Sequence, residues 1–258
     1  MIVGFAGSGN MSGGMARGWA AADAGPEQML FTDSGSGRAS ELAAEVGGEA
    51  VGTNAELAER SDVLVLGVKP YHLDDVAADA QAAPVVLSML GAVPVTRVAE
   101  AFPGSAAIRL MPNLGVQVGR GVICFAPGPD VGEETTIPIL ELLAPLGRVE
   151  PMDDALVDGA TAVMGCTPAY LALAAEAIAV AGARDGVDPA LARSLINDTM
   201  AGTAELLRLY EPEPLRTAVA SPGGSTEAGL DVLAERNVPE AFEAAVDASL
   251  ARMRGTDG

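Results

Sequence analysis

Short apolar runs alternate with helical patterns along the first part of the chain, separated by short glycine-rich connections. Strand and helix in alternation predict parallel strands joined by right-handed crossovers. We therefore expect an α/β fold whose N-terminal part is a Rossmann-type, doubly wound parallel sheet. The expected strands are 2–6, 29–33, 63–68, 85–90, 106–111, 122–126 and 148–152, and the expected helices are 11–25, 37–47, 71–81, 95–102 and 133–147.

The pattern changes after Met152. From Asp153 onward the strand-like runs stop, and the sequence has the pattern of helices broken by glycine, proline and polar residues. The chain is therefore expected to divide into a Rossmann domain, residues 1–152, and a C-terminal all-helical domain, residues 153–258.

The first part of the helical domain is apolar on nearly every side. Between Ala155 and Ala183 only Asp158 and Glu176 are charged, so almost every face of this segment must be buried. About a hundred residues of helix cannot bury it alone. We predict a homodimer in which a second copy covers it; packing against the first domain alone is the alternative. Charged residues, glycine and proline interrupt the segment, so a membrane span of about 20 apolar residues is not expected.

Charge excludes several classes of partner. The chain has 35 acidic and 15 basic side chains and a formal net charge of −20. That sign is wrong for binding nucleic acid or an anionic membrane. Lys69 is the only lysine, and a lysine-poor acidic surface is typical of a halophilic protein in a salt-rich cytoplasm. A GC-rich coding sequence would produce the same bias.

The cysteines and the N-terminus also indicate the cytoplasm. Cys124 and Cys166 lie in apolar surroundings and are expected to be reduced. The first ten residues lack the basic start of a signal peptide. Histidine, cysteine and carboxylates do not cluster at metal-ligand spacing, so no metal is expected.

Candidate chemistry begins at the first turn, GSGNMSGG, which follows a strand and opens a helix. In this setting Gly7 permits the tight turn, and Gly9 lets the backbone approach a pyrophosphate at the helix N-terminus. Ser12 replaces the third glycine of the dinucleotide fingerprint. A glycine-rich turn without a ligand is the alternative.

The end of the second strand carries two opposed signals about the cofactor. Asp33 fits the ribose 2′-hydroxyl of NAD. Ser34, Ser36 and Arg38 fit the 2′-phosphate of NADP, which an acidic neighbour would repel. The residues alone leave both cofactors open.

Lys69 lies in VKP, at the carboxyl end of a later strand, where ligands bind in such folds. The alternative is that this one lysine is retained by chance and has no role in binding. His72, the only histidine, is expected to be solvated.

A second candidate site lies in SPGGSTEAGL, from Ser221 to Leu230. The glycines allow a close backbone approach, and Ser225 or Thr226 is expected to cap the following helix. Free N–H groups at the helix N-terminus would hold a small carboxylate. A capped helix without a ligand is the alternative.

Five motifs in this order, GSGNMSGG, VKP, RLMPN, GCTPAY and SPGGSTEAGL, resemble those of the pyrroline-5-carboxylate reductase family along essentially the whole chain. The resemblance implies an NAD(P)H-dependent imine reductase of proline biosynthesis, with NADP favoured and NAD possible. It also implies a C-terminal helical domain that dimerises, and the dimers of this family often assemble into rings.

The resemblance implies roles for individual residues. Hydride would pass from the nicotinamide to the C5 carbon of the C=N bond, and Thr226 would donate a hydrogen bond to the imine nitrogen. Lys69 is the second candidate catalytic residue. With Ser34 and Arg38 added from the cofactor argument, the expected cofactor-binding residues are Gly7, Ser8, Gly9, Asn10, Met11, Ser34, Arg38, Asn54, Val68, Lys69, Pro70 and Asn113, and the expected substrate-binding residues are Ser221, Gly223, Gly224, Ser225 and Thr226.

Two motifs depart from the family pattern. Leu114 and Gly115 replace the end of MPNTP, and Cys166 and Thr167 replace the small pair of GSGPAY. Both changes fall beside the expected pocket. Reduction of another cyclic imine or a ketimino acid is therefore the second hypothesis, and a non-catalytic dinucleotide-binding protein is the third.

Overall fold

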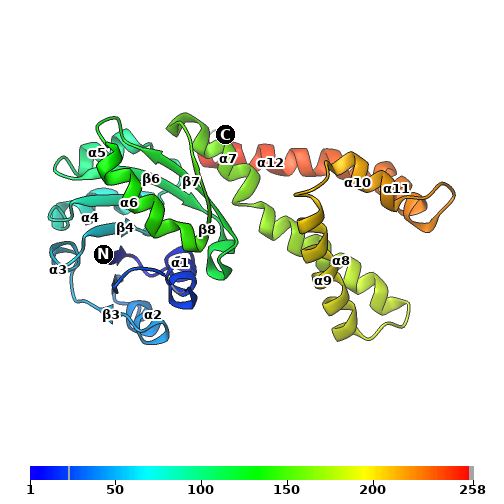
Figure 1. Ribbon diagram of the computed structural model, residues 1–258, viewed down its shortest axis with the longest axis horizontal. Helices are drawn as coiled ribbons and strands as arrows, with labels where there is room; N and C mark the ends of the chain where they lie inside the picture. The colour runs from blue at the N-terminus through cyan, green and yellow to red at the C-terminus, as the bar shows by residue number, and fades with distance from the viewer. Residues whose placement is uncertain (23, 256–258) are drawn as a thin grey trace. The chain divides into compact units, whose positions relative to one another are not determined.

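The computed structural model describes residues 1–22 and 24–255 and contains an eight-stranded sheet (Figure 1). Its strand order is β3-β2-β1-β4-β5-β6-β7-β8, which reverses direction between β1 and β4, as in a Rossmann sheet. The predicted fold class is therefore confirmed. The strands are β1 (Ile2–Ala6), β2 (Gln28–Thr32), β3 (Glu49–Ala50), β4 (Val63–Leu66), β5 (Val85–Ser88), β6 (Ala106–Pro112), β7 (Gly121–Pro127) and β8 (Gly147–Pro151).

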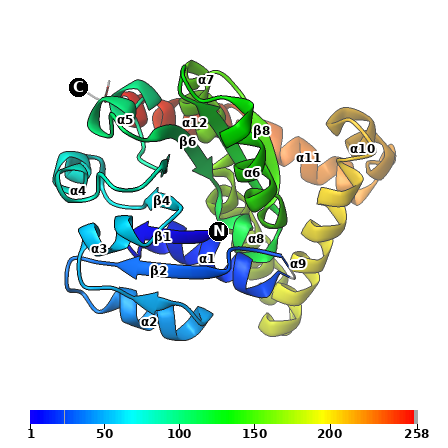
Figure 2. The same cartoon turned by 60° about the vertical axis from the view of Figure 1, so that its left-hand side comes forward.

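Helices cover both faces of the sheet, and each face has its own buried cluster (Figure 2). Successive side chains of a strand point to opposite faces, so each central strand contributes to both clusters. One face carries α1 (Asn10–Ala21), α2 (Arg38–Val46) and α6 (Glu133–Leu143), and the other carries α3 (Asn54–Glu59), α4 (Leu73–Asp79) and α5 (Val95–Ala101). Short 3-10 helices are η1 (Pro70–His72), η2 (Leu114–Val118) and η3 (Ala144–Leu146).

The last two strands correct the expectation of an entirely parallel sheet. β6 pairs antiparallel with β7, and β7 pairs parallel with β8, so β7 and β8 run against the other strands. Residues 113–120 join β6 to β7. This link is too short for a crossover, because a parallel connection needs about a dozen residues or more. The hydrophobic pattern also missed the short elements β3 and α3.

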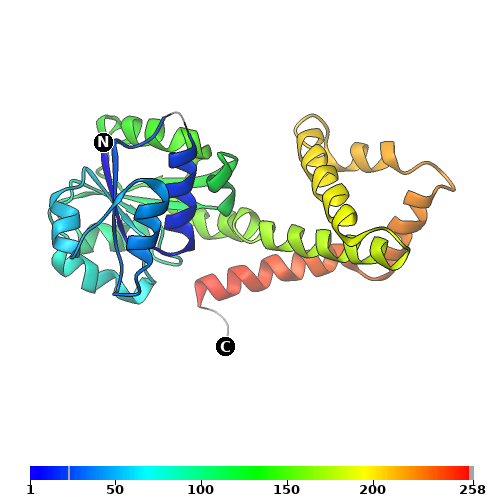
Figure 3. The same cartoon turned by 90° about the horizontal axis from the view of Figure 1, so that it is seen from below.

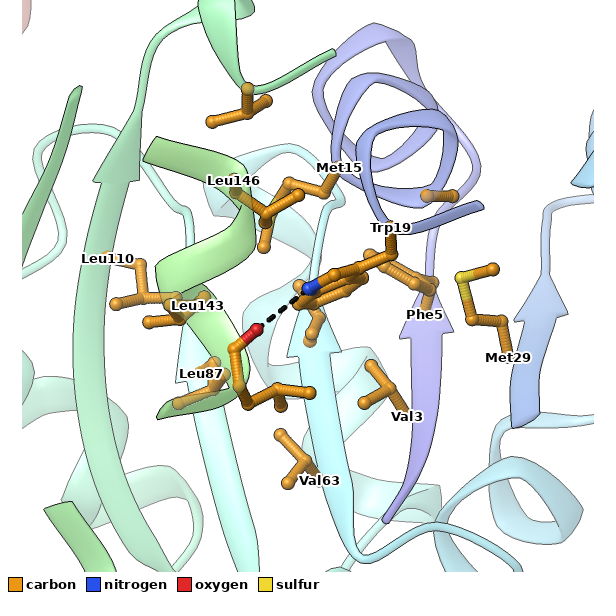
Figure 4. Close-up of a cluster of buried hydrophobic side chains, with 14 of the residues drawn as sticks. Val3, Phe5, Met15, Trp19, Met29, Val63, Leu87, Leu110, Leu143 and Leu146 are labelled. Atoms are coloured by element: carbon orange, nitrogen blue, oxygen red, sulfur yellow. Dashed lines mark hydrogen bonds between the residues drawn. The ribbon is translucent and has the colours of Figure 1, made fainter. Parts of the chain in front are cut away.

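Aromatic side chains fill the core on the α1 face (Figure 4). Phe5 stacks on Phe31 with ring centroids 5.2 Å apart, and Trp19 packs against Phe5 at 6.0 Å. The Trp19 indole N–H donates to the carbonyl of Leu142 over 2.8 Å. The polar atom of this large buried side chain is thereby satisfied, and α1 is tied to the end of α6.

A buried ion pair anchors the first helix of the C-terminal region, α7 (Asp154–Met164), to the sheet. Arg109 of β6 is 3% exposed and pairs with Asp154 and Asp158 of α7. Asp154 also accepts the Val95 amide at the start of α5. The aspartates that interrupt the apolar helix therefore attach it to the strands.

The chain packs as two compact units. The sheet unit comprises Met1–Gly165 with the chain from Leu250 onward, and the helical unit comprises Cys166–Ser249. Strands end at Pro151, but α7 still packs on β6 and β7, so the division of packing falls after Gly165. Of the residues in the expected elements and domains, 23 and 256–258 lie outside the described part.

The helical unit has little core of its own. Among its described residues only Ala179 and Ala192 of the hydrophobic side chains are buried, while Leu173 is 67% exposed and Ile178 is 55% exposed. α8 packs on α9 (Figure 3), and the Tyr170 hydroxyl forms a hydrogen bond with that of Ser249 in α12 over 2.6 Å. The helices are α8 (Thr167–Arg184), α9 (Pro189–Leu206), α10 (Pro212–Val219), α11 (Ser225–Glu235) and α12 (Val238–Arg254).

One apolar stretch has the length and composition of a membrane span, although its charged residues, glycine and proline predicted otherwise. Residues 154–184, which contain α7 and α8, are long and apolar enough by length and composition to cross a membrane, and an 18-residue window within them has a mean hydropathy of 1.6. This criterion alone is weak, because any helix whose apolar surface is buried by a partner also meets it. The exposed leucines and isoleucines of this stretch are the surface for which a second copy was predicted.

Both cysteines are free thiols, as predicted. Cys124 is buried in β7, and burial raises the pKa of its thiol above the usual range. A protonated buried thiol behaves as a small apolar side chain.

Candidate active site

The carboxyl ends of β1 and β4 meet where the strand order reverses, and Gly7 and Gly67 follow these two strands. Gly7 has a φ of +97°, and a Cβ on it would lie 2.8 Å from the carbonyl oxygen of Gly67. Only glycine fits this conformation and this close approach. Ligands bind at such a switch point in open α/β sheets.

The N-terminus of α1 points its free donors into this crevice. Gly9 is the N-cap, and the amide of Gly13 donates to its carbonyl. The amides of residues 10–12 precede the first helical bond and have no partner among the described residues. Space is open around Gly9, because the nearest atom to a Cβ there is 3.9 Å away. These donors and the helix dipole suit a pyrophosphate.

Ser12 occupies the position of the missing fingerprint glycine, and the structure accommodates it through Gly67. Ser12 is 1% exposed. A Cβ on Gly67 would lie 2.1 Å from the Ser12 hydroxyl oxygen, which has no hydrogen-bond partner within the described ranges. The close approach of helix and strand is thus kept by a glycine on the strand side.

A cleft of about 720 Å³ opens at this switch point. It brings together ten of the twelve residues predicted to bind the cofactor, whereas Pro70 and Asn113 do not line it. The predicted residues in its lining are Gly7, Ser8, Gly9, Asn10, Met11, Ser34, Arg38, Asn54, Val68 and Lys69. The cleft is also lined by residues that sequence reasoning did not assign to it, namely Thr32, Gly67, Asp75, Val76 and Met89.

Hydrogen bonds set the floor of the cleft. The Ser8 hydroxyl donates to the carbonyl of Thr32 over 3.0 Å, and the Thr32 hydroxyl donates to Asn54 Oδ1 over 2.8 Å. The Asn54 amide nitrogen stays available to a ligand. Strand β2 and helix α3 are thereby joined beside the first turn.

Asp33 is turned into its own loop. Its Oδ1 accepts the Gly35 amide over 2.7 Å, and its Oδ2 accepts the Ser36 hydroxyl and the Ala39 amide, each over 2.9 Å. These bonds, first that of Ala39 and then those of Ser36, Gly35 and Arg38, hold the pKa of the Asp33 carboxyl below its usual range. An aspartate followed by Gly at the second position and Ser at the third is an Asx-turn signal that the sequence offered.

Lys69 and His72 lie together on the other wall of the cleft. Lys69 is exposed and has no ion-pair partner within residues 1–22 and 24–255. His72 is half exposed, contacts Asp75 Oδ2 over 3.1 Å through Nδ1 and packs on the Tyr71 ring. His72 was expected to be solvated, and it is exposed while it also lines the cleft.

The Asn113 side chain is engaged in hydrogen bonds within the protein. Its Oδ1 accepts the amides of Gly115 and Val122, and its Nδ2 donates to the carbonyl of Met164 over 3.1 Å. It therefore ties the β6–β7 link to the end of α7. Its contact with the nicotinamide stays a prediction.

The predicted substrate residues lie in the helical unit, in the turn before α11 and at the start of that helix: Ser221, Gly223, Gly224, Ser225 and Thr226. The N-cap is Gly224, without a side-chain bond, which corrects the expectation that Ser225 or Thr226 caps the helix. Glu227 instead holds the preceding turn, because its Oε2 accepts the Gly223 amide over 2.6 Å, and within the described chain the first amides of the helix stay free. The hydroxyl of Thr226 and the amides of residues 225–227 have no partner among the described residues.

Comparisons with known proteins agree with this architecture. A family model described as pyrroline-5-carboxylate reductase dimerisation matches residues 154–256. A model described as NADP oxidoreductase, coenzyme F420-dependent, matches residues 2–91. A pyrroline-5-carboxylate reductase from Synechocystis is 37% identical over 204 residues, which cover 77% of this chain and 76% of that protein. The chain belongs to the pyrroline-5-carboxylate reductase family.

Solved structures share the whole fold. A 1-pyrroline-5-carboxylate reductase from Streptococcus pyogenes superposes with a TM-score of 0.90 at 25% identity and covers 99% of this chain and 98% of its own. A pyrroline carboxylate reductase from Plasmodium falciparum, solved with NADP bound, has a TM-score of 0.88 at 23% identity and covers 100% of this chain and 98% of its own. The helical region that the hydrophobic pattern separated is thus the dimerisation region of this family, and the protein is an oligomeric oxidoreductase with a small-molecule substrate.

Proposed function

We propose that this member of the family reduces 1-pyrroline-5-carboxylate to L-proline with NADPH. The observation that carries the proposal is the convergence of ten predicted cofactor residues on one cleft at the switch point of the sheet. Family membership supplies the substrate class.

The cleft fits a dinucleotide. The free amides at the start of α1 would hold the pyrophosphate, and Asn54 would lie by the adenosine half. NADP is favoured over NAD because the Asp33 carboxylate is engaged by its own loop while Arg38 faces the cleft. We assign Lys69 and Val68 to the nicotinamide side with Pro70 and Asn113.

Substrate binding is assigned to the turn before α11. The free amides of residues 225–227 would hold the carboxylate of the imino acid at the helix N-terminus. The bound cofactor supplies the hydride. Thr226 would donate a hydrogen bond to the ring nitrogen and so make the C=N carbon more electron-poor towards the hydride, and the nitrogen would take a proton from solvent to complete the amine.

The domain roles follow the same division. We propose that residues 1–152 bind the dinucleotide and that residues 153–258 dimerise and hold substrate. The exposed apolar face of α8 would be covered by a second copy and not by lipid, and the homodimers would assemble further into rings. A cytoplasmic location and adaptation to high salt follow from the net charge of −20 and the free cysteines.

Oxidation of NADPH and NADH by the purified protein, assayed in molar salt, tests the proposal. The substrates would be 1-pyrroline-5-carboxylate and a panel of other cyclic imines and ketimino acids. Highest kcat/KM for 1-pyrroline-5-carboxylate with NADPH is expected. A better alternative imine would favour the second hypothesis, to which the exchanged Leu114, Gly115, Cys166 and Thr167 point. Nucleotide binding without turnover would leave only the non-catalytic reading.

A further inference from the structure

We propose that Asp33 is a positioning residue for NADP: its carboxylate organises the loop from Ser34 to Arg38 as the subsite for the 2′-phosphate and does not bind the ribose. The inference rests on the proposed function for the identity of the nucleotide. It assigns to an acidic residue at the end of β2 the opposite effect from the NAD preference that this position usually signals.

Hydrogen-bond capacity is the first argument. A carboxylate has about four acceptor sites. Three bonds to Asp33 come from residues of its own loop, at 2.7 to 2.9 Å. Binding both hydroxyls of a ribose would require two acceptor sites, and the three loop bonds leave only about one. The carboxylate would therefore have to release the loop in order to bind NAD in the usual way.

Loop conformation is the second argument. Gly35 and Gly37 have φ values of +86° and +82°, and nothing lies within 4 Å of a Cβ placed on either. Glycine is present there for backbone conformation and not for space. This turn places the Ala39 amide, at the start of α2, where it donates a hydrogen bond to Asp33. Asp33 is thus the group on which this glycine-rich turn closes.

The direction of the donors is the third argument. The Ser36 hydroxyl donates its proton to Asp33, so it has none left for a phosphate oxygen. Ser34 and Arg38 line the cleft, and neither side chain has a hydrogen bond or ion pair among the described residues. They are the free donors of the loop, while Ser36 serves with Asp33 to hold it.

The negative charge of Asp33 argues against a phosphate subsite in this loop. A carboxylate near a phosphate repels it. Hydrogen-bond donors of the loop surround the Asp33 charge, and the Arg38 side chain, which lines the cleft, is the loop's cation for the phosphate. If Asp33 orders the loop, replacing it should weaken binding of the 2′-phosphate, whereas if it repels the phosphate, replacing it should strengthen binding. One experiment therefore separates the two effects.

The experiment is calorimetric titration of the purified protein with 2′,5′-ADP and with ADP, which differ in the 2′-phosphate. For Asp33→Ala we expect the affinity for 2′,5′-ADP to fall about tenfold and that for ADP to change less than about twofold, since a disordered loop must be reordered on binding. Asp33→Asn should also lower the affinity for 2′,5′-ADP, although it removes the negative charge. The matched control is Asp62→Asn, which alters a carboxylate that accepts the Ile2 amide at the opposite end of β1.

Tighter binding of 2′,5′-ADP by either Asp33 variant would overturn the proposal and show that repulsion dominates. Unchanged binding would overturn it as well. Amide hydrogen exchange without ligand gives an independent readout: Gly35 and Ala39 should lose protection in Asp33→Ala and not in Asp62→Asn. Retained protection contradicts the proposal even where a variant melts early. A wild-type protein that binds ADP and 2′,5′-ADP equally would instead show that the assignment of NADP itself fails.

Discussion

Arg109 on β6 and Asp158 on α7 form an ion pair in which the guanidinium is 3% exposed and the carboxylate is 21% exposed. Asp154, one turn earlier on the helix, completes the arrangement. The pair joins the sheet to the helix that leads into the dimerisation region. Because Arg109 cannot lose its charge, it depends on these aspartates wherever it stays buried.

Asp158→Asn should therefore destabilise the protein by about 3 kcal/mol, since a buried guanidinium would keep only Asp154 as an anionic partner. Urea unfolding measures the loss. The matched control is Glu150→Gln, which breaks an ion pair with Arg148, whose side chain is 74% exposed. That loss should stay below about 1 kcal/mol. Equal losses in the two variants would contradict the anchoring role.

Gly67→Ala should cost about 1–3 kcal/mol, because a Cβ at this position overpacks the contact with Ser12. Ser12→Ala removes the hydroxyl oxygen that the new Cβ would meet at 2.1 Å. The double variant should therefore lose less stability than the sum of the single variants, with a coupling of about 1 kcal/mol. Additive losses, measured by thermal unfolding of all four proteins, would show that the two residues are independent.

Thr226→Val keeps the branched shape and removes the hydroxyl proposed to contact the imine nitrogen. A hydrogen bond to a charge-developing group contributes about 1.5–3 kcal/mol, so kcat/KM should fall roughly ten- to a hundredfold with cofactor affinity nearly unchanged. The melting temperature should stay constant, because Thr226 makes no capping bond.

Thr199→Val is the control for that substitution. The Thr199 hydroxyl donates to the Leu195 carbonyl within α9 over 2.7 Å, on an exposed face. The same change in shape and polarity should leave the kinetics unaltered there. Full activity of Thr226→Val would remove Thr226 from the active site.

Leu173→Asp should shift the protein towards monomers in light scattering, because a charge on the exposed apolar face of α8 would have to be buried in the dimer. Ile137→Asp is the control. Ile137 is 50% exposed on α6 of the sheet unit, outside the dimerisation region. A folded wild-type monomer at micromolar concentration would contradict the interface itself.

Salt should stabilise the protein. A net charge of −20 on each copy repels itself at low ionic strength, and the screening length shrinks from about 30 Å at 0.01 M to about 3 Å at 1 M. We expect the melting temperature to rise by several degrees between dilute buffer and molar sodium chloride. An unchanged melting temperature would argue against adaptation to salt.

Sequence periodicity predicted most of the sheet because each buried strand is a continuous apolar run. It could not predict that β7 runs antiparallel, because an apolar run has no direction; the length of the link from Asn113 to Arg120 contained that information. It also missed β3, which has two residues, and α3, which has six. Both are too short for a periodic signal.

The cleft at the switch point was predictable because its residues follow strand ends, and strand ends converge at one edge of a parallel sheet. What the sequence could not supply was the direction of side chains. The position of Asp33 left a bond to a ribose hydroxyl open, while its hydrogen bonds go to its own loop. Ser225 or Thr226 was expected to cap α11, whereas the N-cap is Gly224 without a side-chain bond, and Glu227 reaches back to the Gly223 amide.

Trp19 is the only tryptophan of the chain and lies 3% exposed in the core of the sheet unit, with its indole N–H bound to Leu142. Intrinsic fluorescence excited at the indole band therefore reports on the sheet unit, while the helical unit contains tyrosines but no tryptophan. Circular dichroism in the far ultraviolet follows the helices of both. Recorded together during a denaturant titration, the two signals would distinguish a chain that unfolds in one cooperative step from one whose dimerisation helices melt first.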